Sequence, residues 1–402
     1  MIDRIRSWLG SLGPGLIIAA LVFGPSKMTI TSKLGAGYGF ATLWIVVVAI
    51  FFMMIFTAMS ARIGHATQRS LLSIIADKWG RPAGIIAGIG IFLVCTSFQA
   101  GNSVGVGVAL AELTHTSVTP WIILFNIIGI GLLFFRSFYK TLERLMIALI
   151  GIMLAAFLVT VFLVKPDPAQ TATGFIPSIP KGSQGLMIAF MASCFSIVGA
   201  FYQSYLVQER RRLQPAKASQ RKSNSLTGII ILGFMSAIVM ICAAAVLHPQ
   251  GIRVNTATDM SKALEPLFGR YASGLFLTGL FAASFSSIVG NASVGGILLG
   301  DALGFGSDFS ARKTRLFIAL VMIAGAVIAI AFGRLPLELI VFAQSVTIFI
   351  VPFIGIAMYL IANNEKIMGE AKNSGFVRIA GALGLLVIIF LAAVNFKDLF
   401  LK

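Results

Sequence analysis

Acidic side chains are scarce in this chain of 402 residues, which has 14 aspartates and glutamates against 31 lysines and arginines. It also has only three histidines and three cysteines. Cys95, Cys194 and Cys242 lie far apart in apolar runs, a pattern that excludes a clustered zinc site and indicates buried small side chains. The sequence shows no nucleotide-binding glycine loop, nucleophile triad or titratable pair. We therefore predict neither an enzyme nor a bound cofactor.

Charge of either sign is rare as well, at 11% of residues, whereas hydrophobic residues make up 58% and the mean hydropathy is +0.95. A soluble core of this size does not need so much apolar surface, but repeated membrane spans of ~20 residues do. The net charge of +17 comes from basic residues scattered through short loops. That pattern is typical of membrane topology, and we predict no nucleic-acid partner.

Eleven apolar segments follow one another and predict an all-α integral membrane protein with a single transmembrane domain over residues 1–402. A polar connection between two of them contains Ala263-Leu-Glu-Pro-Leu-Phe, which predicts a short interfacial helix. The segments lie near residues 12–34, 40–62, 84–112, 118–136, 143–165, 184–209, 224–247, 268–302, 313–332, 336–361 and 375–395.

Basic residues are unevenly divided between alternate loops. The loops on the side of the N-terminus carry 21 of the 31 lysines and arginines, the opposite loops carry nine, and Lys27 is the remaining one. Because cytoplasmic loops are enriched in basic residues, we predict a multi-pass protein of the plasma or bacterial inner membrane. Its N-terminus is then cytoplasmic and its C-terminus outside. Membrane lipid is an expected partner, and the oligomeric state is not indicated.

One charged residue, Lys27, lies inside an apolar segment, in the stretch Gly24-Pro25-Ser26-Lys27. A lysine near mid-bilayer costs at least ~2.5–3.5 kcal/mol and by default marks a substrate path or a paired site. Glycine and proline indicate an interrupted helix, which at that depth is tolerated only where it lines a cavity or is buried in protein. We therefore predict a binding site here, the alternative being a lysine that only supports the break structurally.

Two segments five apart in the order show a weak internal repeat. Ser97-Phe-Gln-Ala-Gly-Asn-Ser-Val-Gly in the third matches Ser284-Phe-Ser-Ser-Ile-Val-Gly-Asn-Ala-Ser-Val-Gly in the eighth. Each has Ser-Phe, then Gly-Asn, then Val-Gly. This offset is the one that a five-plus-five inverted repeat requires.

Several motifs along the chain resemble the natural resistance-associated macrophage protein (NRAMP) family. They are Leu12-Gly-Pro-Gly-Leu, Gly35-Ala-Gly-Tyr-Gly, Ser60-Ala-Arg-Ile-Gly, Tyr139-Lys-Thr-Leu-Glu-Arg, Leu264-Glu-Pro-Leu-Phe, Gly279-Leu-Phe-Ala-Ala-Ser-Phe-Ser-Ser, Pro352-Phe and Lys366-Ile-Met-Gly. The resemblance implies a LeuT-like fold of about eleven helices, with helices one and six broken. Residues 12–165 are then the first repeat, 184–361 the second, and 375–395 helix eleven.

The metal-binding motifs of the family are replaced in this chain. The family binds divalent transition metals with Asp-Pro-Gly-Asn in helix one and Met-Pro-His in helix six. The positions of the aspartate and of the asparagine correspond here to Gly24 and Lys27. In helix six, Ser196, Ile197 and Val198 stand in place of Met-Pro-His. Gln344 keeps the helix-ten glutamine of the family. Every acidic residue is predicted outside the span interiors, so no carboxylate remains at these positions. The residues that replace the motifs carry no imidazole or thioether either.

The favoured function is an alternating-access secondary transporter of a small anionic or zwitterionic solute, such as an organic acid, an amino acid or bicarbonate, bound near Lys27. The alternative is transport of a divalent metal cation, as in the family at large, in a largely hydrated form. A further alternative is a non-transporting sensor or partner subunit.

Two sets of candidate residues follow, and neither includes a resident metal site. The predicted substrate-binding residues are Gly24, Pro25, Ser26, Lys27, Ser196, Ile197, Val198 and Gln344. The predicted coupling or gate residues are Lys27, Gln99, Asn102, Tyr202, Gln203 and Asn291.

Overall fold

The computed structural model describes residues 23–67, 69–134, 136–195, 197–213, 225–308, 311–332 and 336–401, and every regular element in these ranges is a helix. Nine stretches of the described chain are long and apolar enough to cross a membrane. Their main helices are α3 (Trp44–Ala66), α5 (Arg81–Thr114), α7 (Arg136–Val164), α9 (Gln184–Phe195) with α10 (Ile197–Leu213), α12 (Ser225–Val246), α15 (Ala272–Ala302), α16 (Arg312–Ala331), α17 (Pro336–Thr347) with α18 (Val351–Ala362), and α20 (Gly375–Phe400).

Two further helices account for the remaining predicted segments. The apolar helix α6 (Val118–Leu132) is shorter than the others. The helix α2 (Pro25–Tyr38) is the second half of the first segment, whose beginning lies outside the described residues. The predicted all-α membrane fold is confirmed, while the predicted limits of the two repeats, 12–165 and 184–361, stay a prediction.

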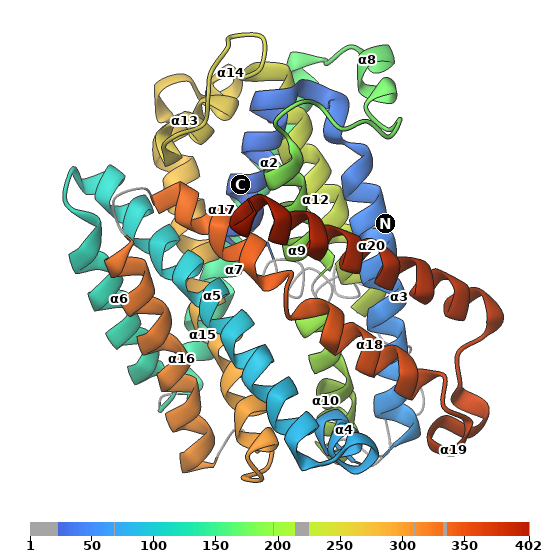
Figure 1. The fold of residues 1–402 in the computed structure, drawn as a ribbon. Coiled ribbons are helices and arrows are strands. Elements are labelled where there is room, and N and C mark those ends of the chain that lie inside the picture. The colour runs from blue at the N-terminus through green and yellow to red at the C-terminus, as the bar shows by residue number, and fades with distance from the viewer. Residues whose placement is uncertain are drawn as a thin grey trace, which may run out of the picture.

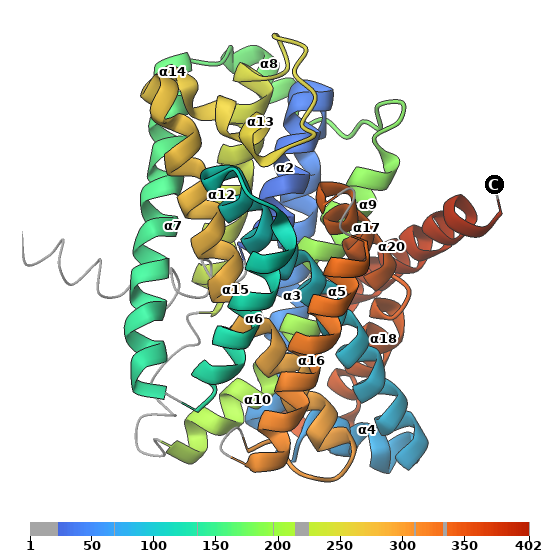
Figure 2. The same cartoon turned by 90° about the vertical axis from the view of Figure 1, so that its left-hand side faces the viewer.

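Short helices mark the two ends of the bundle (Figures 1 and 2). The helices α8 (Pro168–Thr173), α13 (Ala257–Ser261) and α14 (Glu265–Phe268) lie at the top of both views, and α4 (Leu71–Trp79) lies at the bottom. We call these the α8 end and the α4 end. The interfacial helix predicted at 263–268 contains α14. The helix α4 was not predicted, because an amphipathic stretch this short lacks the apolar run of a span.

The helices α5 and α15 pack against each other in antiparallel directions along most of their length. A methyl group on Gly88 would lie 2.2 Å from Ala302 Cβ, and one on Gly295 would lie 2.6 Å from Cys95 Cβ. Small residues let membrane helices approach closely, where dispersion contacts replace the hydrophobic driving force. The two similar segments at 97–105 and 284–295 therefore face each other across this contact, where Gly105 meets Ser284.

The remaining contacts divide most of the helices into two groups. One group consists of α5, α6, α15 and α16, which pack on each other. The other consists of α2, α3, α9, α10 and α12, among which the α3–α10 and α2–α12 contacts are the most extensive. The break in the first helix lies where the two groups meet, because α2 also touches α5, α15 and α17.

The tenth predicted segment, 336–361, is confirmed as an apolar stretch long enough to cross a membrane, but it is not one continuous helix. It consists of α17 and α18, separated by a turn at 348–350 ahead of Pro352. Proline is well placed in a helix's first turn but disfavours continuation of the preceding helix. The carbonyl of Ser345 near the turn accepts a hydrogen bond of 3.0 Å from Asn395 Nδ2 of α20. The hydropathy of the segment does not reveal so short a turn.

The α2–α12 contact yields a matched test of this packing. A methyl group on Gly35 would lie 2.3 Å from the Met240 carbonyl oxygen, whereas one on Gly37 of the same helix meets nothing within 4 Å. Overpacking against backbone costs ~1–3 kcal/mol, while alanine in an open helical position is favourable. We expect Gly35→Ala to lower the melting temperature in detergent and Gly37→Ala to preserve or raise it. Equal melting temperatures would contradict the close α2–α12 approach.

Candidate functional site

The helix α2 starts inside the bundle, directly after Gly24. Gly24 is extended (φ −81°, ψ −178°), and Pro25 occupies the first helical position of α2. Proline suits this position because its φ is preset and its missing N–H needs no partner. The Gly24 carbonyl accepts hydrogen bonds from the backbone N–H groups of Lys27 (3.1 Å) and Met28 (3.3 Å). Three residues of the break predicted over 24–27 are therefore helical, because Pro25, Ser26 and Lys27 form the first turn of α2.

Polar side chains from three other helices surround this helix start. A methyl group on Gly24 would lie 3.2 Å from Ser287 Oγ of α15 and 3.5 Å from Asn102 Oδ1 of α5. Gln344 Nε2 of α17 donates a hydrogen bond of 2.9 Å to Ser26 Oγ. We call Gly24, Ser26, Asn102, Ser287 and Gln344 the break cluster.

The break cluster has unused hydrogen-bonding capacity. Gln344 is 2% exposed, and its Oε1 has no hydrogen-bond partner within the described residues. A buried acceptor left unsatisfied costs ~1–3 kcal/mol, so such atoms mark candidate ligand contacts. All the side-chain ligand atoms available here are neutral oxygens, which suit hard cations and hydrogen-bond donors.

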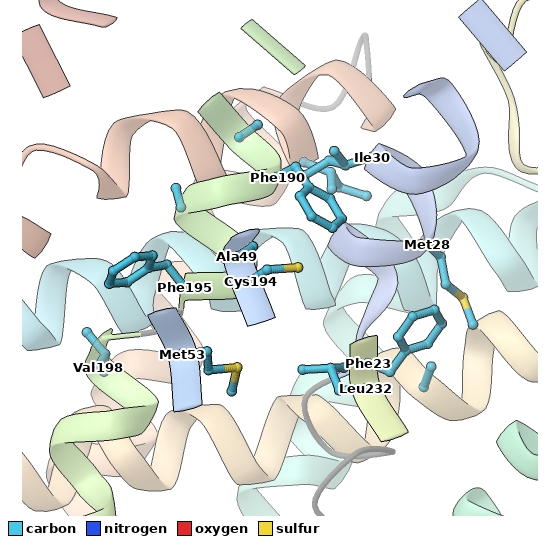
Figure 3. Close-up of a cluster of buried hydrophobic side chains, with 14 of the residues drawn as sticks. Phe23, Met28, Ile30, Ala49, Met53, Phe190, Cys194, Phe195, Val198 and Leu232 are labelled. Carbon is cyan, nitrogen blue, oxygen red and sulfur yellow. The ribbon is translucent and has the colours of Figure 1, made fainter. Parts of the chain in front are cut away.

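Lys27 points to a different side of α2 from Ser26. Successive helical residues are about 100° apart around the axis, so the Lys27 side chain leaves α2 in a different direction from that of Ser26, whose hydroxyl accepts the Gln344 hydrogen bond. Lys27 is only 3% exposed. Apolar side chains of α2, α3, α9 and α10, including Met28, Phe195 and Val198, gather in this part of the bundle (Figure 3). The break thus has a side with neutral oxygens and a side with an amine.

The sixth predicted segment, 184–209, contains α9 and α10 on either side of one residue that the structure does not describe. Ser196, between them, lies outside the described residues. Ile197 and Val198 are buried apolar residues in the first turn of α10, so the interruption predicted over 196–199 extends too far into α10. Their side chains bring no polar atom to the site, and only their backbone groups remain as candidate contacts.

The predicted coupling or gate residues occupy separate positions. Asn291 Nδ2 donates to the Cys95 carbonyl (2.7 Å) and to Gln99 Oε1 (3.3 Å), so this amide pair links α15 to α5. Asn102, one turn from Gln99, belongs to the break cluster. On α10, Gln203 is buried and the Tyr202 ring stacks on Tyr205.

Sequence reasoning missed Ser287 and the Ser26–Gln344 hydrogen bond. Ser287 closes the quoted motif that starts at Gly279, so a signal for it was present. The pairing of Ser26 with Gln344, 318 residues away, depends on a tertiary contact that no local pattern encodes.

Among the residues that the structure describes, no group of three or more His, Cys, Asp or Glu side chains could hold a metal ion. A divalent ion at the break cluster would therefore meet neutral oxygens and no anionic ligand from these residues. Dehydration of such an ion without an anionic ligand is costly, so this site fits an ion that keeps part of its water shell.

The helix arrangement is that of the LeuT-like secondary transporters. The manganese transporter of Eremococcus coleocola, solved with an aromatic bis-isothiourea substituted compound, has a TM-score of 0.72 at 19% identity, over 98% of this chain and 87% of that chain. MhsT in complex with L-phenylalanine has a TM-score of 0.60 at 15% identity, over 94% and 98%. At these identities the likeness establishes the fold alone.

The sequence matches the natural resistance-associated macrophage protein-like family over residues 15–397, and the chain belongs to this family of membrane transporters. Two relatives each bear the name divalent metal cation transporter MntH. The one from Deinococcus radiodurans is 25% identical, over 96% of this chain and 89% of the relative. The one from Bacillus subtilis is 24% identical, over 99% and 94%.

The Ser26–Gln344 hydrogen bond predicts a non-additive effect on stability. Ser26→Ala leaves Gln344 without its partner and should destabilise the protein by ~1–3 kcal/mol, whereas removing both polar groups costs less. We expect Ser26→Ala to lower the melting temperature and the double variant Ser26→Ala/Gln344→Leu to recover part of the loss. Additive losses from the two single changes would show that these side chains do not act as a pair.

Proposed function

We propose that this protein is an alternating-access secondary transporter whose cargo binds at the break cluster. The position of the cluster supports this, because it lies at a buried helix start where the two helix groups meet. Discontinuous helices form binding sites near the bilayer midplane in transporters of this architecture. Opposed movement of the two groups exposes such a site to one side of the membrane at a time.

For the cargo, a divalent metal cation is the first candidate. The names of the relatives support it, and they favour it over the anionic solute that the sequence alone suggested. The observation that carries this candidate is the unpaired Gln344 Oε1 among the neutral oxygens of the break cluster. Since sulfur and imidazole ligands are not gathered there, we expect a hard ion such as Mg²⁺ or Mn²⁺ that retains water.

Lys27 limits where a cation binds. An ammonium group ~6 Å from a divalent ion opposes binding by roughly 5 kcal/mol at an effective dielectric constant of ~20. The cation therefore binds on the Ser26 side, towards α5 and α17. Lys27 remains on the α9 side, where its charge lowers the affinity without occupying the site.

A small anionic or zwitterionic solute is the second candidate, and one specific observation favours it. Lys27 is nearly fully buried in the first turn of α2, where the helix dipole also attracts negative charge. A carboxylate there would pair with the ammonium and leave the break cluster to bind the polar remainder of the solute.

The two candidates predict opposite effects of Lys27→Met. Removing the ammonium should leave cation binding unchanged or strengthen it, whereas loss of a buried charge partner weakens binding of an anion by ~2–5 kcal/mol. Thermal shifts of the purified protein with Mg²⁺, Mn²⁺, bicarbonate, acetate and glycine measure both. We expect stabilisation by a divalent cation that persists in Lys27→Met. Stabilisation by an anion alone, lost in Lys27→Met, would establish the second candidate.

A carboxylate at position 24 provides a sharper test of the cation site. A side chain on Gly24 would enter the break cluster between Ser287 and Asn102, so Gly24→Asp adds an anionic ligand beside the neutral oxygens. We expect it to raise Mn²⁺ affinity at least ten-fold relative to Gly24→Asn, which has the same shape without charge. Equal Mn²⁺ affinities of the two variants, measured by isothermal titration, would show that the break cluster is not the cation site.

We further propose a bacterial plasma membrane location with the α4 end in the cytoplasm. The basic residues of the richer loop set, such as Arg69, Lys78 and Arg211, lie at this end, where they also meet anionic lipid. We expect Arg211→Cys to react with an impermeant maleimide in inside-out vesicles and Lys181→Cys in right-side-out vesicles. Reaction of both from one side would contradict the topology.

A further inference from the structure

At the α4 end of the bundle, one buried tyrosine joins three helices. Tyr205 Oη of α10 donates a hydrogen bond of 2.6 Å to the Asp301 carboxylate, one residue from the end of α15. The same oxygen accepts the backbone N–H of Leu72, in the first turn of α4, at 3.4 Å. Tyr205 is 6% exposed and lies stacked between Phe201 and Tyr202.

This tyrosine lies on a helix that belongs firmly to one of the two helix groups. Ser60 Oγ of α3 donates to the Phe201 carbonyl (3.1 Å) and accepts from the Ser204 N–H (3.2 Å). A methyl group on Gly64 would lie 2.6 Å from the Ser204 carbonyl oxygen. The helices α3 and α10 therefore move together, and a displacement of α10 at this end takes α3 with it.

Asp301, in contrast, belongs to the other group. It lies on α15, which packs along α5 and α16, while α10 meets α15 and α4 over few residues. The Tyr205–Asp301 hydrogen bond thus connects the α3–α10 pair to the opposite group at an end where, among the described residues, α10 and α15 have little other contact. In Figure 1, α10, α15 and α4 converge at the bottom of the bundle.

We infer that the Tyr205–Asp301 hydrogen bond is the gate that keeps the α4 end closed, and that release of cargo to this side requires its rupture. The inference rests on the proposed alternating-access function. Separation of the two groups at the α4 end must break this bond and the Leu72 contact, whereas α3 and α10 stay together. A hydrogen bond to a charged group is strong enough to shift a closed–open equilibrium about ten-fold or more.

A native cysteine reports on the gate without any cargo. Cys194 is buried near the end of α9, in the apolar cluster that also contains Met28 of α2 (Figure 3), so it lies at the level of the break and becomes reachable only when one end opens. With Cys95→Ala and Cys242→Ala as background, Cys194 is the single thiol of the chain. Its rate of reaction with an impermeant maleimide is measured in inside-out and right-side-out vesicles.

We expect Tyr205→Phe to raise the Cys194 labelling rate about ten-fold from the α4 end and not from the α8 end. Tyr359→Phe is the matched control, since it removes a tyrosine hydroxyl that donates to the Arg378 carbonyl and leaves the Tyr205–Asp301 bond intact. An unchanged rate in Tyr205→Phe, or an equal rise from both ends, would overturn the gate.

Asp301→Ala removes the acceptor of the same hydrogen bond, and it replaces Tyr205→Phe as the test if that variant does not fold. The double variant should label no faster than the faster single variant, because both changes break one bond. Independent, multiplying effects would contradict the inference. The Cys194 labelling is measured without cargo, so its result does not depend on which solute the protein carries. An unchanged labelling rate would contradict the gate but would not alter the thermal-shift titrations of the cargo.

Discussion

The start of helix α2 inside the bundle, next to Gly24, is the constraint on which the rest of this structure depends. A helix that starts inside a membrane protein presents polar backbone groups that lipid cannot satisfy. Here they are enclosed by protein, with Ser287, Asn102 and the Ser26–Gln344 pair around the helix start. The same enclosure forms the candidate site, because it gathers polar side chains around a buried helix start, and one of their atoms, Gln344 Oε1, has no partner among the described residues.

Close packing holds the site in place. Glycines allow α5 and α15 to approach along their length on one side, and α2 and α12 on the other. The break lies between these two tightly packed units, so a small relative rotation changes the access to it without disturbing either unit. A single hydrogen bond at the α4 end, between Tyr205 and Asp301, then has a large influence on which side is open.

Much of the fold could be predicted from the sequence, because the length and apolarity of a membrane span are encoded locally. The eleven segments, the Gly24–Pro25 break and the matched stretches in α5 and α15 all came from composition and short motifs. The turn between α17 and α18 did not, since three apolar residues before Pro352 do not alter the hydropathy of a span. Lys27 and Val198, which were predicted to lie within the helix breaks, are helical.

The candidate site was harder to predict than the fold. Ser26, Lys27, Asn102 and Gln344 could be named, but their division into an oxygen side and an amine side required the structure. A lysine in the break suggested an anion, whereas Gln344 Oε1, which has no hydrogen-bond partner among the described residues, lies beside Ser26 and suits a cation.

The most direct measurement of the central claim is an anomalous difference map from crystals of the protein soaked with Mn²⁺. If the cation binds at the break cluster, we expect a single peak inside the bundle that contacts Ser26 and Gln344 directly or through water. The peak should lie on the side of α2 away from Cys194. A peak elsewhere in the chain, or no peak together with ordered anion density beside Lys27, would contradict it.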